Sequence, residues 1–201
     1  LFEGLTTTDE NGKVVPGAAE SWKQTSANTW IYHLRKNGKW SNGQPVVADD
    51  FVYAWQRFID PKTASPYAST FGSFILNGKE ILQGKKAPSD LGIKALDTYT
   101  LEIKTPYPVL FMPSLLANPQ LAPLPKKVID QFGKEWTKPG KIVSNGAYFL
   151  KAWQVNSKIV TEKNIHYWDA KNVHLTQVTF LPIEDANSDV KLYETGQKEW
   201  V

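Results

Sequence analysis

The spacing of the large apolar side chains changes along the chain, and this change constrains the fold more than any other feature. In "TWIYHLRK" (29–36), bulky apolar residues stand at every second position, which predicts a strand with at least one buried face. In residues 48–59, Phe51, Trp55 and Phe58 recur at helical spacing, which predicts an amphipathic helix. A sequence that switches between these periods predicts the α+β class, with mixed or mostly antiparallel sheets.

Turn and breaker residues divide the rest of the chain into short elements. Pro61 ends the first helix, and Asn77-Gly78 separates two further helical pieces within 71–84. The other expected elements are a turn at Asn11-Gly12, a hairpin over 93–104 around Asp97-Thr98, a short helix with a loop in 107–119, a short helix over 126–133, two strands in 146–164, a strand over 176–183 and a helix over 184–196. The proline-rich "QLAPLPKK" (120–127) is the candidate boundary between subdomains.

The composition excludes several classes of protein. The 201 residues contain no cysteine, which rules out disulfides, thiolate metal sites and iron–sulfur clusters. The net charge is +3, and the only arginines are Arg35 and Arg57, so we expect no nucleic-acid partner. No apolar run approaches the roughly 20 residues that a membrane helix needs. The chain starts at Leu1 rather than at methionine, which is typical of a mature or trimmed product.

No catalytic constellation emerges from the sequence. The three histidines, His33, His166 and His174, lack metal-ligand spacing, and no P-loop, dinucleotide fingerprint or nucleophile elbow is present. Asp49 and Asp50 are neighbours on the predicted helix, where side chains point about 100° apart, so they suit the helix dipole better than a glycosidase pair. The residues alone therefore predict an aromatic-rich binding protein that is not an enzyme and holds no cofactor or metal.

Several specific segments of the chain resemble a known family. The run "GAAESWKQTSANTWIYHLRKNGKWSNGQPVVADDFVYAWQRFIDPKTASPYAS" (17–69), with "LFEGL" before it, resembles the solute-binding proteins of peptide ABC importers (extracellular solute-binding protein family 5), and most of all the oligopeptide-binding members. The segments "EILQGKK", "DLGIKALDTYTLEI", "PLPKKVIDQFG", "NGAYFLKAW" and "TFLPIEDANSDVKLYETG" continue the resemblance in the same order along essentially the whole chain. Because members of the family extend further at both ends, the resemblance implies an N-terminal fragment.

The resemblance implies a partial periplasmic-binding-protein-like fold (type II, cluster C). Residues 4–126 would form a small family-specific α+β domain. Residues 1–3 and 127–201 would form part of the first ligand-binding lobe, with the second lobe absent. The implied function is the capture of oligopeptides between two lobes that close like a hinge, followed by delivery to a permease complex in the inner membrane. The implied location is the periplasm, and we expect a monomer.

The resemblance also implies two ligand-binding residues. Tyr67, in "SPYAS", matches a contact near the amino end of the peptide, and Asn118, in "LANPQ", matches a polar pocket-lining position where relatives often carry histidine. The acid that meets the α-ammonium of the peptide and the bases that meet its carboxylate would belong to the missing lobe. Val47 stands where relatives commonly carry threonine, so the helix after it is expected to lack a side-chain cap.

Alternatives remain open at this stage. Tyr67 could be a half-buried loop tyrosine that packs on the helix, with no ligand role. The same fold could bind a murein peptide, a dipeptide, a nickel complex or haem. A carbohydrate-binding or glycosidase module is a third class, in which tryptophans would stack on sugars, although we expect four of them to be structural: Trp22, Trp30, Trp40 and Trp55.

Overall fold

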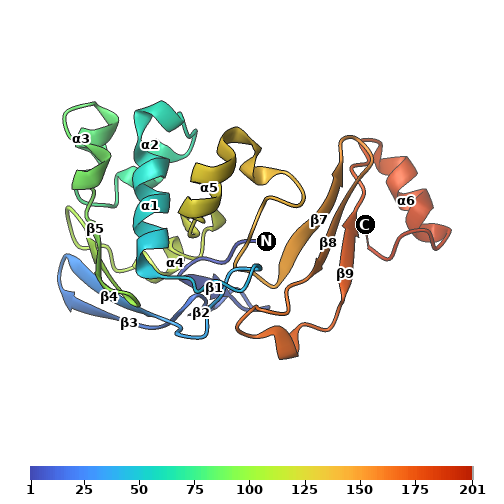
Figure 1. The fold of residues 1–201 in the computed structure, drawn as a ribbon, viewed down its shortest axis with the longest axis horizontal. Coiled ribbons are helices and arrows are strands. Elements are labelled where there is room, and N and C mark those ends of the chain that lie inside the picture. Colours follow the sequence, from blue (N-terminus) through green and yellow to red (C-terminus); the bar gives the residue numbers. More distant parts are fainter. Residues whose placement is uncertain (201) are drawn as a thin grey trace.

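The computed structural model describes residues 1–200, which form three antiparallel β-sheets with helices packed beside them (Figure 1). A two-stranded sheet pairs β1 (Thr6–Thr8) with β2 (Val14–Pro16). The four-stranded sheet has the order β3 (Ala19–Ser26), β4 (Thr29–Leu34), β6 (Thr100–Lys104), β5 (Ile93–Asp97), and the three-stranded sheet has the order β7 (Tyr148–Gln154), β8 (Lys158–Lys163), β9 (Gln177–Phe180). The predicted α+β class with antiparallel pairing is confirmed.

The helices are short, as the turn residues predict. The α-helices are α1 (Ala48–Ile59), α2 (Ala68–Gly72), α3 (Gly78–Leu82), α4 (Met112–Leu115), α5 (Lys126–Phe132) and α6 (Ala186–Glu194). Single 3₁₀ turns lie at η1 (Pro61–Thr63), η2 (Pro88–Asp90), η3 (Pro119–Leu121), η4 (Gly133–Thr137) and η5 (Ala170–Asn172). The predicted separation of two helical pieces is confirmed, because Asn77 adopts a left-handed conformation (φ 67°) directly before α3. The glycine that ends α5, Gly133, also has a positive φ, of 52°.

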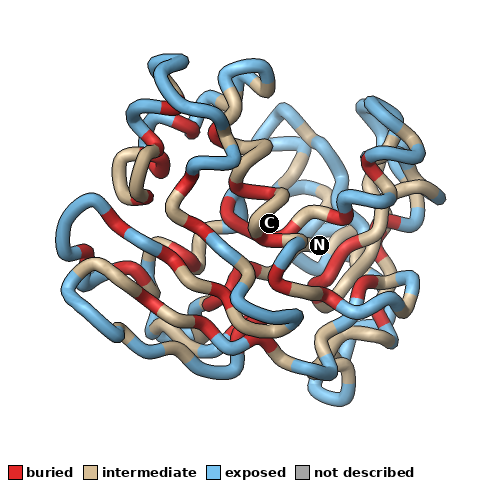
Figure 2. The backbone as a smooth tube through the Cα atoms, turned by 60° about the vertical axis from the view of Figure 1, so that its left-hand side comes forward, coloured by how far each residue is buried: buried red, intermediate tan, exposed pale blue. Residues whose placement is uncertain are grey.

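The main core lies between α1 and the four-stranded sheet. On β4, Trp30, Tyr32 and Leu34 are buried while the side chains between them are not, which confirms the predicted period of two. The same face continues onto β6, because Tyr32 pairs with Leu101. In α1 the predicted stripe faces this core, with Trp55 only 2% exposed. Figure 2 shows buried and exposed positions alternating along the strands of this part of the molecule.

A capping box at the start of a helix has two side-chain hydrogen bonds, and the start of α1 has only one of them. Val47 occupies the N-cap position, and its side chain makes no capping hydrogen bond, as the sequence predicts. Asp50 supplies the reciprocal contact, because its Oδ2 accepts a hydrogen bond from the Val47 backbone N–H at 2.9 Å. The same oxygen accepts from Trp40 Nε1 at 3.2 Å. Burial raises the pKa of Asp50, and these two hydrogen bonds oppose that rise.

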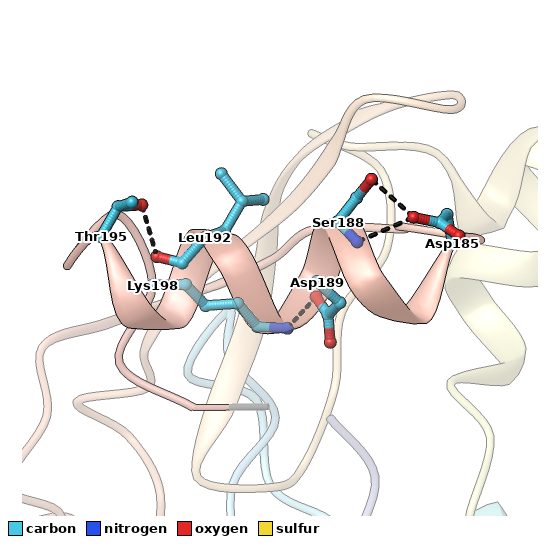
Figure 3. A network of polar contacts seen from close by, with 6 residues as sticks. All are labelled: Asp185, Ser188, Asp189, Leu192, Thr195 and Lys198. Carbon is cyan, nitrogen blue, oxygen red and sulfur yellow. Dashed lines mark hydrogen bonds and ion pairs between the residues drawn. The ribbon is translucent and has the colours of Figure 1, made fainter.

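The last helix, α6, is held mainly by local polar contacts (Figure 3). Asp185 caps it by accepting hydrogen bonds from the backbone N–H and the hydroxyl of Ser188, at 2.8 and 2.7 Å. Lys198 returns along the helix to form an ion pair with Asp189. No residue of α6 is buried. Its predicted position in the chain is confirmed, but its side chains add nothing to the main core.

The three-stranded sheet presents apolar side chains to solvent. Trp153, Ile159 and Phe180 stand side by side across β7, β8 and β9, and Trp153 and Phe180 are half exposed. No helix within residues 1–200 combines the length and the apolar character that crossing a membrane requires. In the same residues, no three His, Asp or Glu side chains come together in a way that could hold a metal ion.

Candidate functional site

The first candidate residue, Tyr67, lies on the surface at the start of α2. The chain leaves α1, passes through η1 and bends at Ala64, which has a left-handed φ of 52°. Tyr67 then takes the N-cap position of α2, where its carbonyl accepts hydrogen bonds from the backbone N–H groups of Thr70 and Phe71. The Tyr67 side chain is 50% exposed, and its hydroxyl makes no hydrogen bond within residues 1–200. The backbone therefore fixes the residue while its hydroxyl remains available.

The second candidate, Asn118, has a clear local role. It precedes η3, and its Oδ1 accepts a hydrogen bond from the backbone N–H of Gln120 at 3.1 Å. Its carbonyl accepts from the backbone N–H of Leu121 at 3.0 Å. Asn118 is therefore a capping residue, and its side-chain NH₂ makes no hydrogen bond within the described residues. Leu121 is in turn tied to α1, because its carbonyl accepts from Trp55 Nε1 at 2.8 Å.

A pocket of about 210 Å³ opens beside Asn118, between its two neighbours in the chain and the N-terminal segment. Its lining comprises Leu1, Phe2, Glu3, Gly4, Thr7, Ala117, Pro119, Gly146, Ala147, Tyr148 and Tyr167. Neither Tyr67 nor Asn118 itself is among these residues. The structure therefore does not bring the two predicted ligand-binding residues together in this pocket.

An exposed apolar cluster lies beside the end of α2 and was not predicted from the sequence. Tyr107 donates a hydrogen bond from its hydroxyl to the carbonyl of Ser73 at 3.3 Å. Phe111 packs edge-on against Phe74, with ring centroids 5.4 Å apart. Leu110, between Tyr107 and Phe111, is 75% exposed. The available signal was the apolar run "YPVLF", whose prolines indicated only a helix with a loop.

A partly buried acidic group belongs to Glu3, which the sequence did not single out. Its Oε1 accepts a hydrogen bond from the Tyr167 hydroxyl at 2.5 Å, and its Oε2 accepts from Trp168 Nε1 at 2.8 Å. Its backbone exchanges two hydrogen bonds with the side chain of Asn145, at 3.0 and 2.9 Å. Burial raises the pKa of Glu3 in spite of these hydrogen bonds. The pKa of Tyr167 is raised as well, first by burial and then by the neighbouring Glu3 carboxylate.

Arg35 joins this group of residues through the ring of Trp168. Its guanidinium lies 3.6 Å from the centroid of the Trp168 ring, in a cation–π contact, and its Nε donates to the carbonyl of Gly17 at 2.7 Å. The Glu3 cluster, which comprises Glu3, Arg35, Asn145, Tyr167 and Trp168, thus joins the N-terminus, the end of β4 and the segment after β8. Its groups satisfy one another, which is typical of a structural contact rather than of a catalytic one.

Three of the four tryptophans that were expected to be structural are in the core, and the fourth packs against it. Trp30, Trp40 and Trp55 are at most 7% exposed, and Trp22 is partly buried and stacks on Tyr32 with ring centroids 6.0 Å apart. These contacts confirm the expectation that these four residues are structural.

Comparison with known proteins places the chain in a family. Residues 13–201 match the family described as bacterial extracellular solute-binding proteins, family 5 middle. The periplasmic oligopeptide-binding protein OppA of Escherichia coli (strain K12) is 50% identical to this chain over 198 residues, which cover 98% of this chain and 36% of that protein. The periplasmic murein peptide-binding protein MppA of the same strain is 46% identical, with the same coverage.

A solved structure agrees with these relatives. Haemophilus influenzae OppA in complex with RPPGFSPFR superimposes with a TM-score of 0.94 at 46% identity, covering 98% of this chain and 39% of that chain. This chain therefore spans little more than a third of the length of the proteins that it resembles.

Proposed function

The chain belongs to family 5 of the bacterial extracellular solute-binding proteins, and from this premise we propose that it forms part of a periplasmic protein that captures oligopeptides for an ABC importer. The periplasmic-binding-protein-like fold is confirmed in part-length form by the superposition on solved members. The observation that carries the proposal is 50% identity to an oligopeptide-binding protein over nearly the whole chain. The protein binds and releases its solute without chemical change, needs no cofactor, acts as a monomer and passes its cargo to a membrane permease.

We propose that the ligand lies between two lobes, of which this chain supplies part of one. Residues 4–126 form the small family-specific domain, and residues 1–3 and 127–201 belong to the first lobe. The hydrogen bonds that tie Glu3 to Asn145, Tyr167 and Trp168 support the grouping of the first residues with the later segment. Peptide main-chain groups would pair with protein backbone, while hydrated, roomy pockets would accept varied side chains.

Tyr67 is the proposed contact near the amino end of the peptide. Its half-exposed side chain and free hydroxyl support this role, because a ligand acceptor would be its first hydrogen-bond partner. Asn118 is the proposed pocket-lining residue, which would offer its NH₂ group because its Oδ1 already caps η3. The partners of both residues would lie on the second lobe.

The test is calorimetric peptide binding by a polypeptide that contains this chain and extends to the length of its relatives. Tyr67→Phe removes only the hydroxyl and should weaken binding of RPPGFSPFR by about 1 kcal/mol or more, and Tyr67→Ala should weaken it further. Tyr107→Phe is the matched control, since that hydroxyl already bonds within the chain and should not affect affinity. Unchanged affinity in both Tyr67 variants would show that Tyr67 is scaffold. Residues 1–201 alone should bind the peptide weakly or not at all.

The runner-up is a murein peptide as the natural ligand, which the 46% identity to MppA favours. Native mass spectrometry of the longer polypeptide, purified without denaturation, separates the two. A mixture of co-purified peptides supports the oligopeptide proposal, whereas a single defined mass supports the murein peptide or another dedicated solute. A protein that carries no bound mass would count against both.

A further inference from the structure

A second pocket, of about 370 Å³, lies between the turn at 40–47, the first turn of α1 and the first turn of α5. Its lining comprises Trp40, Asn42, Gln44, Pro45, Val47, Asp49, Asp50, Pro125, Lys126, Lys127, Val128 and Val143. The volume is in the range of small-molecule sites. The pocket shares no residue with the one beside Asn118 and does not include Tyr67, so it is independent of the proposed peptide cleft.

The apolar wall of this pocket is held in place before any ligand arrives. The Trp40 indole is 3% exposed, and its Nε1 donates to Asp50 Oδ2. Phe2 packs edge-on against the same indole, with ring centroids 6.5 Å apart. Because this indole is almost fully covered, the accessible apolar surface comes from Val47, Val128 and the other aliphatic lining residues. A preformed apolar wall reduces the ordering cost that a small ligand must overcome.

Charged groups of both signs enter the pocket from different helices. Asp49 and Asp50 come from α1, and Lys126 and Lys127 come from α5. Asp50 is already engaged by two hydrogen bonds, and Lys126 forms an ion pair with Asp130. Within residues 1–200, Asp49 and Lys127 have no side-chain hydrogen bond or ion pair. One carboxylate and one ammonium therefore lack a direct partner on two different walls, and the Lys127 ammonium also acts on the nearby Asp50 carboxyl by lowering its pKa.

We propose that this pocket binds a small zwitterion with an apolar side chain, of the free amino-acid class. Its ammonium group would face Asp49, its carboxylate would face Lys127, and its aliphatic body would lie on the wall formed by the lining valines. An amine without a carboxylate would leave Lys127 unpaired, and an acid without an amine would leave Asp49 unpaired. The zwitterion is the one of the three that matches both free charges.

Three probes with similar branched aliphatic bodies test the proposal: L-leucine, 3-methylbutylamine and 4-methylpentanoate. The readout is the indole N–H resonance of Trp40 in ¹H–¹⁵N spectra, identified by its loss in Trp40→Phe. This resonance reports on the pocket because Trp40 Nε1 donates to Asp50 in its lining, and the charge variants below separate binding here from binding elsewhere. For ligands of this size we expect a dissociation constant of about 1–10 mM for leucine.

Two variants of similar size each remove one of the two charges, so the contribution of each charge to binding is measured separately. Asp49→Asn should weaken the binding of leucine and of the amine by about two- to fivefold, as expected for a partly exposed ion pair, and leave the acid unaffected. Lys127→Gln should weaken leucine and the acid to a similar extent and leave the amine unaffected. Tyr67→Ala should change none of these titrations, which separates this site from the proposed cleft. The proposal is overturned if leucine leaves the Trp40 resonance unmoved, if the amine or the acid binds as tightly as leucine, or if neither charge variant weakens leucine.

Discussion

Replacing Trp55 with Phe tests whether one buried hydrogen bond holds the segment that carries Asn118. The Trp55 side chain is 2% exposed, and its Nε1 donates to the carbonyl of Leu121 at 2.8 Å in the interior. Trp55→Phe leaves this carbonyl without its donor, at a cost of about 1–3 kcal/mol. The smaller ring also gives up buried surface and leaves a gap, which adds about 1 kcal/mol. The free energy of unfolding should therefore fall by about 2–4 kcal/mol.

Trp30→Phe provides a matched control, because it removes the same atoms from a tryptophan that is also buried. The Nε1 of Trp30 has no hydrogen-bond partner within residues 1–200, so its removal relieves an unsatisfied donor while losing similar packing. This variant should lose about 1 kcal/mol or less. Urea unfolding followed by far-ultraviolet circular dichroism measures both changes. If the two variants lose the same stability, the bond from Trp55 to Leu121 does not hold this segment, and the reasoning fails.

Three further predictions concern stability. Tyr32→Phe should leave the free energy of unfolding unchanged or raise it by up to about 1 kcal/mol, because the buried hydroxyl has no partner in the described chain; a clear loss in urea unfolding would contradict this. Gly78→Ala should lower the free energy of unfolding by about 2 kcal/mol or more, since a Cβ there would lie 2.0 Å from the carbonyl oxygen of Gly72. An unchanged free energy in urea unfolding would show that α2 and α3 move apart freely. Burial raises the pKa of Glu3 above its ordinary value of 4.5, so the folded state binds the proton more readily than the unfolded state. The stability that this group contributes is therefore full below pH 4.5 and falls as the pH rises through the folded-state pKa. The free energy of unfolding of the wild type minus that of Glu3→Gln should decrease from pH 4 to pH 7, and an increase would refute the sign.

The elements that the sequence predicted well are those with a local pattern. The alternation in β4 and the helical stripe in α1 each reflect one buried face, so a few consecutive residues reveal them. The hairpin of β5 and β6 and the break at Asn77 depend on turn residues, which also act locally. By contrast, β3 was not predicted as a strand. Its side chains are mostly exposed, with only Ala19 buried, so it has no clear alternation and is defined by its pairing with β4.

Long-range contacts explain most of what the sequence did not predict about the site. Glu3 meets partners 164 and 165 residues away, and no local pattern marks it as buried. The capping role of Asn118 is a different case, because an asparagine directly before a proline is a local helix-start signal that can be recognised in the sequence. The ligand roles of Tyr67 and Asn118 remain predictions that rest on family resemblance, since their proposed partners lie outside this chain.

The Glu3 cluster bears on where the proposed hinge can lie. The four-stranded and three-stranded sheets do not share strands, and they are joined through Glu3, through the Arg35 stack on Trp168, and through the hydrogen bond from the Ser41 N–H to the Ser144 carbonyl at 2.8 Å. Separating these parts would break several polar contacts at once, including two hydrogen bonds to the Glu3 carboxylate that are worth about 1.5–3 kcal/mol each. That combined cost is at least comparable to the few kcal/mol that separate the open and closed states of a typical two-state protein, so closure has no reason to break these contacts. Lobe closure around a peptide should therefore leave these joined parts as one rigid unit and bend the polypeptide between this unit and the second lobe.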